Sequence, residues 1–114
     1  MSAASGLPGF VYLASFERAA KGLLNEAARN EIERVLTQNP EAGDVIAGTG
    51  GVRKIRFGQQ WRGKRGGIRV IYYHRSTIGR VYLITVYAKN VRVNLTFAQR
   101  NMMKQLTTEL DNEA

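Results

Sequence analysis

Apolar side chains recur with helical spacing in two neighbouring segments near the N-terminus. After a short strand-like run at residues 10–13, Ser15 is a typical N-cap, and the apolar residues after it lie three or four positions apart. A second stripe follows the potential cap Asn25 and ends before Pro40, which disfavours a helical residue in front of it. The spacing predicts a hairpin of two helices. The residues of the two stripes are Phe16, Ala19, Ala20, Leu23 and Leu24, then Ala28, Ile32, Val35 and Leu36.

Beyond residue 51 the pattern changes to the alternation and β-branched content that are typical of strands. In the first such segment, Ile55 and Phe57 face one side of a sheet, and the residues beside them face the other. Thr96 is a suitable cap for a last helix at residues 97–110. Three strands are predicted here, at residues 52–57, 68–74 and 80–88.

These elements predict an α+β fold in one domain. We expect an antiparallel four-stranded sheet that includes the run at residues 10–13, with its helices on one face: a two-helix hairpin and a short C-terminal helix. The domain is expected to span residues 10–110, between a flexible leader at residues 1–9 and a tail at residues 111–114. A chain of 114 residues suits one small core.

Composition excludes several kinds of protein. The chain has no cysteine, which excludes disulfides, thiolate metal sites and a cysteine nucleophile, and its one histidine excludes a cluster of imidazole ligands. No apolar run approaches the roughly 20 residues that span a bilayer, and the N-terminus lacks the pattern of a signal peptide. We therefore expect a cytoplasmic protein that uses neither a metal nor a cofactor and has no membrane partner.

Charge is distributed unevenly along the chain. The net charge is +8, and residues 52–100 hold 12 basic side chains and no acidic one. No carboxylate side chain occurs between Asp44 and Glu109. Because protein surfaces normally mix both signs, a surface this one-sided predicts a polyanionic partner, either nucleic acid or another phosphate-rich surface.

The segment at residues 58–67 is a candidate RNA-contacting loop. Its start matches the front of a phosphate-binding P-loop, but Arg65 follows where a serine or threonine is needed, and a strand rather than a helix comes next. Trp61 could stack on a base or pack at the edge of the core. Basic residues expected to contact the RNA backbone are Arg62, Lys64 and Arg65 in this loop and Arg92 after the last strand.

A second group of basic residues lies within or next to the strands. Because no acidic residue is near them in sequence, these cations repel one another unless an anion fills the space between them. Arginines hold phosphate bidentately, and clustered cations lower the pKa of a neighbouring lysine or tyrosine, so the group could cleave RNA without metal. The candidate catalytic residues are Lys54, Arg56, Arg69, Tyr87 and Lys89.

Four ordered segments resemble the RelE/HigB-type toxins of bacterial toxin–antitoxin pairs, and the resemblance extends over residues 10–108. The segments are GDVIAGTGGVRKIRF at residues 43–57, GKRGGIRVIYY at 63–73, LITVYAKN at 83–90 and NLT at 94–96. The resemblance implies a RelE-like fold and cleavage of mRNA on the ribosome without metal. It also implies a cognate antitoxin of the helix-turn-helix, HigA-like type.

The resemblance also implies roles for single residues. It places the family's basic pair on Lys54 and Arg56, its phosphate-holding arginine on Arg69 and its last basic residue on Lys89. The tyrosine that transfers a proton in RelE-like members falls on Leu95, so the general base stays open among Tyr87, Lys89, Lys64 and His74. The alternative function is a non-catalytic basic module that binds RNA or DNA.

Overall fold

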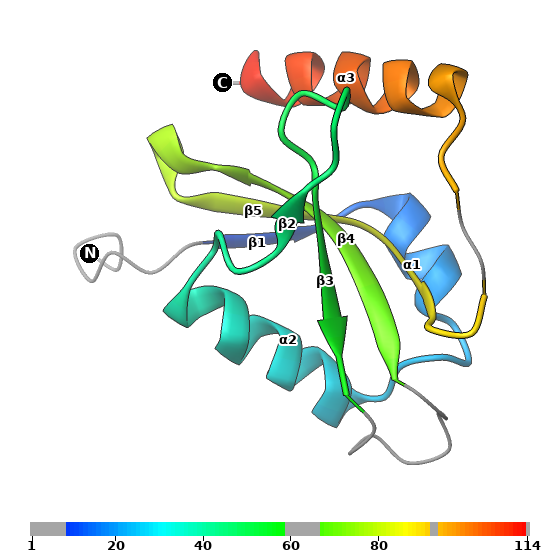
Figure 1. Ribbon diagram of the computed structural model, residues 1–114. Coiled ribbons are helices and arrows are strands. Elements are labelled where there is room, and N and C mark those ends of the chain that lie inside the picture. Colours follow the sequence, from blue (N-terminus) through cyan, green and yellow to red (C-terminus); the bar gives the residue numbers. More distant parts are fainter. Residues whose placement is uncertain (1–8, 59–66, 92–93, 114) are drawn as a thin grey trace.

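The computed structural model describes residues 9–58, 67–91 and 94–113. In this part of the chain, five strands form one mixed sheet in the order β1-β5-β4-β3-β2, as Figure 1 shows. Every neighbouring pair is antiparallel except β1 and β5, which run parallel. The elements are β1 (Gly9–Tyr12), α1 (Ala14–Ala20), α2 (Glu26–Gln38), β2 (Asp44–Val45), β3 (Arg53–Phe57), β4 (Ile68–Arg75), a short 3₁₀ turn (Ser76–Ile78), β5 (Arg80–Ala88) and α3 (Phe97–Asp111).

The sheet differs from the sequence prediction in two respects. The prediction of four strands was wrong because β2 adds a fifth, a two-residue strand whose exposed side chains carry no strand pattern. The prediction of a wholly antiparallel sheet was wrong because β1 pairs in parallel with β5. The helices α1 and α2 carry the chain from β1 to β2 at the opposite edge of the sheet, so the neighbour of β1 is the last strand of the chain and not the next one. β1 begins at Gly9, the last residue of the predicted leader, and residues 1–8 lie outside the described residues.

Two of the three predicted helix caps are confirmed. The Asn25 side chain accepts a hydrogen bond from the Ala28 N–H at 2.8 Å, and Thr96 forms a capping box with Gln99 at the start of α3. The cap at Ser15 was wrong because α1 already begins at Ala14. The Ser15 hydroxyl instead donates to the carbonyl oxygen of Ile84 at 2.5 Å, which ties α1 to β5.

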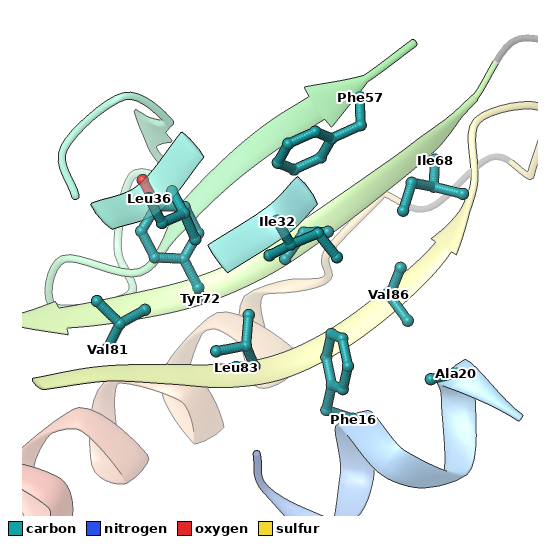
Figure 2. Packing of buried hydrophobic residues seen from close by; sticks show 11 residues of the cluster. Phe16, Ala20, Ile32, Leu36, Phe57, Ile68, Tyr72, Val81, Leu83 and Val86 are labelled. Carbon is teal, nitrogen blue, oxygen red and sulfur yellow. The ribbon is translucent and has the colours of Figure 1, made fainter. Parts of the chain in front are cut away.

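The larger core lies between the sheet and the helix pair α1 and α2, as predicted (Figure 2). Phe16 of α1 and Ile32 and Leu36 of α2 are fully buried against the sheet. Burying each such side chain stabilises the fold by about 1.5–3 kcal/mol. Tyr72 is also buried here, and its hydroxyl accepts a hydrogen bond from the Gly43 N–H at 2.9 Å. The sheet contributes Phe57, Ile68, Val70, Tyr72, Val81, Leu83 and Val86 to this core.

The C-terminal helix covers the opposite face of the sheet, so the prediction that the helices share one face was wrong. Figure 1 shows α3 and α2 on opposite sides of the sheet. Under α3 lies a smaller core around Val52, Ile71 and Ile84, to which Met103 and Leu106 of the helix contribute. The helix spans 15 residues and is therefore not short. No helix in the described residues is long and apolar enough to cross a membrane.

The loop between β2 and β3 supports α3 (Figure 1). Gly50 has φ +78°, and a Cβ atom there would lie 2.5 Å from the Thr107 hydroxyl oxygen on α3. Only glycine fits this backbone conformation at so close an approach. The loop therefore holds α3 over the sheet through its close approach to Thr107.

Candidate nucleic-acid interface

Strand register places three of the five predicted catalytic residues in one row across the sheet. Arg56 on β3 is directly opposite Arg69 on β4, and Arg69 is directly opposite Tyr87 on β5. Their neighbours Ile55, Ile68 and Val70 belong to the core under α1 and α2, so the row lies on the face that α3 partly covers. The candidate interface is this face at the end of the sheet where β3 ends, β4 begins and β5 ends. We call Arg56, Arg69 and Tyr87 the open row.

A second row lies one step further toward α3. Lys54 is opposite Ile71, and Ile71 is opposite Thr85. A β-bulge next to this position lets Ile84 reach the small core under α3 while Thr85 lines the cavity described below. The bulge therefore keeps two successive residues of β5 on the α3 face.

The cations of this face have no side-chain partners within the part of the chain that the structure describes. Within residues 9–58, 67–91 and 94–113, no side-chain hydrogen bond or ion pair involves Lys54, Arg56, Arg69 or Lys89. Arg56 is exposed and the other three are half-buried. Like charges directly opposite each other on a sheet are destabilising. The facing Arg56 and Arg69 therefore favour an anion between or above them.

Lys89 follows directly after β5 and helps to join the strand ends beside the open row. Its backbone N–H donates to the carbonyl oxygen of Gly67 at 3.0 Å. Gly67 has φ +81°, and a Cβ atom there would lie 1.9 Å from the Phe57 carbonyl oxygen, so the position requires glycine. The start of β4 and the end of β5 are thus held together where the cations gather.

A cavity of about 370 Å³ opens between the second row and the start of α3. Its lining combines apolar side chains with a few polar ones, as is common in ligand sites. Sequence reasoning missed Arg100, Thr85 and Asn94. Arg100 follows the Thr96 cap by four residues and lies in the carboxylate-free stretch, which is the signal that could have found it. The lining residues are Ile46, Lys54, Ile71, Thr85, Val86, Tyr87, Asn94, Leu95, Arg100 and Met103.

Leu95 and His74, two positions considered for proton transfer, lie on different faces of the sheet. Leu95, where the family resemblance implies a tyrosine, lines the cavity with an apolar side chain. His74 pairs with Val81 of the larger core and therefore faces away from the open row, with its Nδ1 3.8 Å from a carboxylate oxygen of Glu41. Burial lowers the pKa of His74, and Glu41 opposes that shift. The structure does not bring His74 to the candidate interface.

Trp61, Arg62, Lys64 and Arg65, together with Arg92, lie outside the described residues. Among the residues that are described, no group of three or more His, Asp or Glu side chains could hold a metal ion.

The architecture is that of RelE toxins: three helices and a five-stranded, mostly antiparallel sheet in the described chain. A chain of the toxin–antitoxin complex RelBE2 from Mycobacterium tuberculosis aligns with a TM-score of 0.54 at 16% identity, covering 73% of this chain and 99% of that chain. A mutant of the Escherichia coli toxin RelE in the free state aligns with a TM-score of 0.53 at 15% identity, covering 90% of this chain and 97% of that chain. No protein-family model matches the sequence. At these identities the likeness establishes the fold.

Proposed function

We propose that this protein is the toxin of a toxin–antitoxin pair and cleaves mRNA on the ribosome without a metal ion. The observation that carries the proposal is the open row, Arg56–Arg69–Tyr87, in which two facing arginines have no carboxylate partner in the described chain. The likeness to a chain of a toxin–antitoxin complex and to a free toxin supports the biological role.

The row offers the groups that metal-free RNA cleavage needs. In that reaction the 2′-oxygen attacks the neighbouring phosphorus, the bond from phosphorus to the 5′-oxygen breaks, and a 2′,3′-cyclic phosphate is left. Arg69, in the middle of the row, is assigned to hold the scissile phosphate, and Arg56 and Lys54 to stabilise the charge of the phosphorane.

Tyr87 and Lys89 are assigned to proton transfer. One takes the proton from the attacking 2′-hydroxyl and the other gives a proton to the leaving 5′-oxygen. Tyr87 is directly opposite Arg69 and Lys89 follows the end of β5, whereas His74 faces the other side of the sheet. A site built from such groups is a weak catalyst unless its substrate is held in line, which is the contribution we assign to the ribosome.

Leu95 favours a second candidate function. Its apolar side chain occupies the cavity wall where a proton-transferring tyrosine is implied by the family resemblance. A protein with the cations but without an effective general base would bind RNA or DNA without cutting it. Product analysis separates the two functions, because only the enzyme yields fragments.

The experiment is induced expression in bacteria of the natural protein and two variants. Arg69→Ala removes the central cation of the open row, and Arg34→Ala is the matched control, since Arg34 is an exposed α2 arginine paired with Glu31 at 2.6 Å. We expect growth and translation to stop with the natural protein and with Arg34→Ala, and to continue with Arg69→Ala. Continued growth with all three proteins would contradict the toxin proposal.

Cleavage is then examined on ribosomes programmed with a defined mRNA. The proposed chemistry leaves 2′,3′-cyclic or 3′-phosphate ends, which mass spectrometry distinguishes from 3′-hydroxyl ends. Because ribosomes need Mg²⁺, the metal requirement is tested separately on free RNA at high protein concentration with EDTA. Fragments with 3′-hydroxyl ends, or cleavage of free RNA only when Mg²⁺ is present, would contradict the mechanism.

We further propose that the protein acts in the cytoplasm, with mRNA, the ribosome and an antitoxin of helix-turn-helix, HigA-like type as partners. An antitoxin that covers the cations directly must supply carboxylates, so its complex would weaken strongly with salt. An antitoxin that binds the hairpin of α1 and α2 and blocks ribosome entry would be held mainly by apolar contacts and would resist salt. Pull-down with the neighbouring gene product across salt concentrations distinguishes these cases, and no complex at any salt would count against the toxin role.

A further inference from the structure

The cavity under the start of α3 has the size and the lining of a site for one flat organic group. Its volume of about 370 Å³ falls within the range of small-ligand pockets, and a nucleobase is smaller than this. Ile71 contributes apolar surface from β4, Leu95 from the segment before α3, and Met103 from α3 itself. These walls suit the faces of a planar ring.

Polar side chains also line the same cavity. The Asn94 amide is both a donor and an acceptor, and the Thr85 hydroxyl is likewise able to do both. Tyr87 adds an aromatic ring, a common stacking partner for an unpaired base. The cavity therefore combines apolar surface with hydrogen-bonding groups, which is the chemistry that a nucleobase presents in return.

The open row begins at the wall of this cavity. Tyr87 belongs to both, and its cross-strand neighbour is Arg69, with Arg56 one strand further. Side chains directly opposite on a sheet are about 5 Å apart. A phosphate held by Arg69 is thus a short distance from a base in the cavity, which matches the way a nucleotide joins its base and its phosphate through one sugar.

We propose that the cavity holds one unstacked base of a single RNA strand while Arg69 and Arg56 hold its phosphate. The proposal rests on the proposed function for the binding of RNA by the open row. It makes Asn94 and Thr85 the residues that read the base edge, and it makes α3 a part of the binding site through Met103 and Arg100. A base paired in a duplex cannot enter, so the site selects single-stranded RNA.

The experiment compares a short oligoribonucleotide with a ribose-phosphate oligomer of equal length that carries no bases. Because stacking and burial of a base contribute substantially to affinity, the natural protein should bind the intact oligomer at least about fivefold more tightly. Leu95→Trp fills the cavity and should abolish this preference while affinity for the base-free oligomer stays the same. Asn94→Ala, at an exposed position outside the helices and strands, should reduce the preference without affecting folding.

Phe97→Ala is the matched control. Phe97 is the most exposed large apolar side chain of the described residues, at 81%, and it does not line the cavity. The preference for the intact oligomer should remain after this change. If Phe97→Ala removed the preference, the base would bind on the outside of α3 and not in the cavity, and the proposal would be overturned. Equal binding of intact and base-free oligomers by the natural protein would also overturn it.

Two further outcomes separate the cavity proposal from the proposed function and from a different ligand. If neither oligomer binds with an affinity that falls with salt, the open row does not bind RNA, and both the cavity proposal and the proposed function fail. If a free nucleoside monophosphate binds as tightly as the oligomer, the ligand is a nucleotide rather than a strand, and the assignment to RNA is wrong.

Discussion

Facing arginines and tyrosines lie at both ends of the sheet face that α3 covers. The two ends differ in whether carboxylates of the described residues lie beside these side chains. At one end, Arg75 on β4 is directly opposite Arg80 on β5, and Tyr73 is opposite Tyr82. We call these four residues the closed row. At the other end is the open row, again two facing arginines and a tyrosine. The rows differ in what the C-terminal residues supply.

Carboxylates and carbonyl oxygens are the partners of three of the four residues of the closed row. The Tyr73 hydroxyl donates to Asp111 at 2.7 Å, and the Tyr82 hydroxyl donates to Glu113 at 2.9 Å. Arg75 donates to the carbonyl oxygen of Leu110 at 2.9 Å and lies 3.9 Å from the Asp111 carboxylate. The two tyrosine rings stack with centroids 6.4 Å apart. This fold therefore accommodates two facing arginines where carboxylates such as that of Asp111 lie close to them.

In the described residues, the open row lacks the carboxylate partners that the closed row has. The carboxylates closest in sequence to it are Asp44 before and Glu109 after, and the acidic residues at the C-terminus are used at the closed row. In the described residues, Arg75 of the closed row thus has a carboxylate beside it, whereas neither arginine of the open row has one. The closed row fastens α3 to the sheet, and the open row is available for binding.

The largest expected effect comes from giving the open row an anion of its own. Arg69→Glu places a carboxylate beside Arg56 and should lower RNA affinity by at least about tenfold, because charge-assisted contacts of about 1.5–3 kcal/mol are lost and repulsion of phosphate is added. The melting temperature should not fall, since an attraction replaces a repulsion. Fluorescence anisotropy and calorimetry measure the two quantities, and unchanged affinity would mean that the row does not contact RNA.

The reverse change opens the closed row. Asp111→Ala combined with Glu113→Ala should lower the free energy of unfolding by about 1–2 kcal/mol, because charged hydrogen bonds are lost and partial exposure screens them. Urea denaturation measures this, and amide exchange should quicken toward the end of α3. Affinity for the base-free oligomer should stay constant, and a large fall would show that the two rows are not independent.

Alkaline pH weakens the closed row by a different route. Burial, followed by the Asp111 carboxylate, raises the pKa of Tyr73 to about 12. The folded protein thus holds this proton more tightly than the unfolded chain, in which tyrosine ionises near pH 10. The stability from Tyr73 is full below pH 10 and is lost as the pH rises toward 12. Urea denaturation between these pH values should show a smaller loss for Tyr73→Phe, and an equal loss would exclude Tyr73 as its source.

The smallest effect is a gain in stability. Arg56→Ala removes the repulsion of Arg69 and should raise the free energy of unfolding by about 0.2–1 kcal/mol, the usual size of a cross-strand pair. Arg80→Ala is the counterpart at the closed row, where Arg80 donates to the Tyr82 hydroxyl at 3.3 Å, and it should give no gain. Equal changes in both variants would show that the open row is not strained by its charges.

Strand periodicity indicates from the sequence that Lys54 and Arg56 share one face and that Arg69 lies within a strand. The cross-strand register that brings Arg56, Arg69 and Tyr87 into one row comes from the structure. The direction of β1 was beyond reach, because four apolar residues give no indication of which neighbour they pair with or in which orientation.

The sequence also could not predict which face of the sheet α3 covers. The sheet has apolar residues on both faces, so the stripe of Met103 and Leu106 fits either side. Without that placement, the cavity and the contribution of Arg100 could not be predicted, since they arise only where the helix meets the sheet. The cations were readable from strand spacing, whereas the site that they border depends on tertiary packing.

The salt dependence of RNA binding tests the central claim most directly, because each cation that contacts phosphate steepens it. If about five cations contact a single strand, the slope of log K against log salt is about −3.5. Arg56→Ala combined with Arg69→Ala should make the slope shallower by about 1.4, and Arg34→Ala should leave it unchanged. A slope near zero for the natural protein, or one that the double variant does not alter, would contradict the assignment of the open row to RNA.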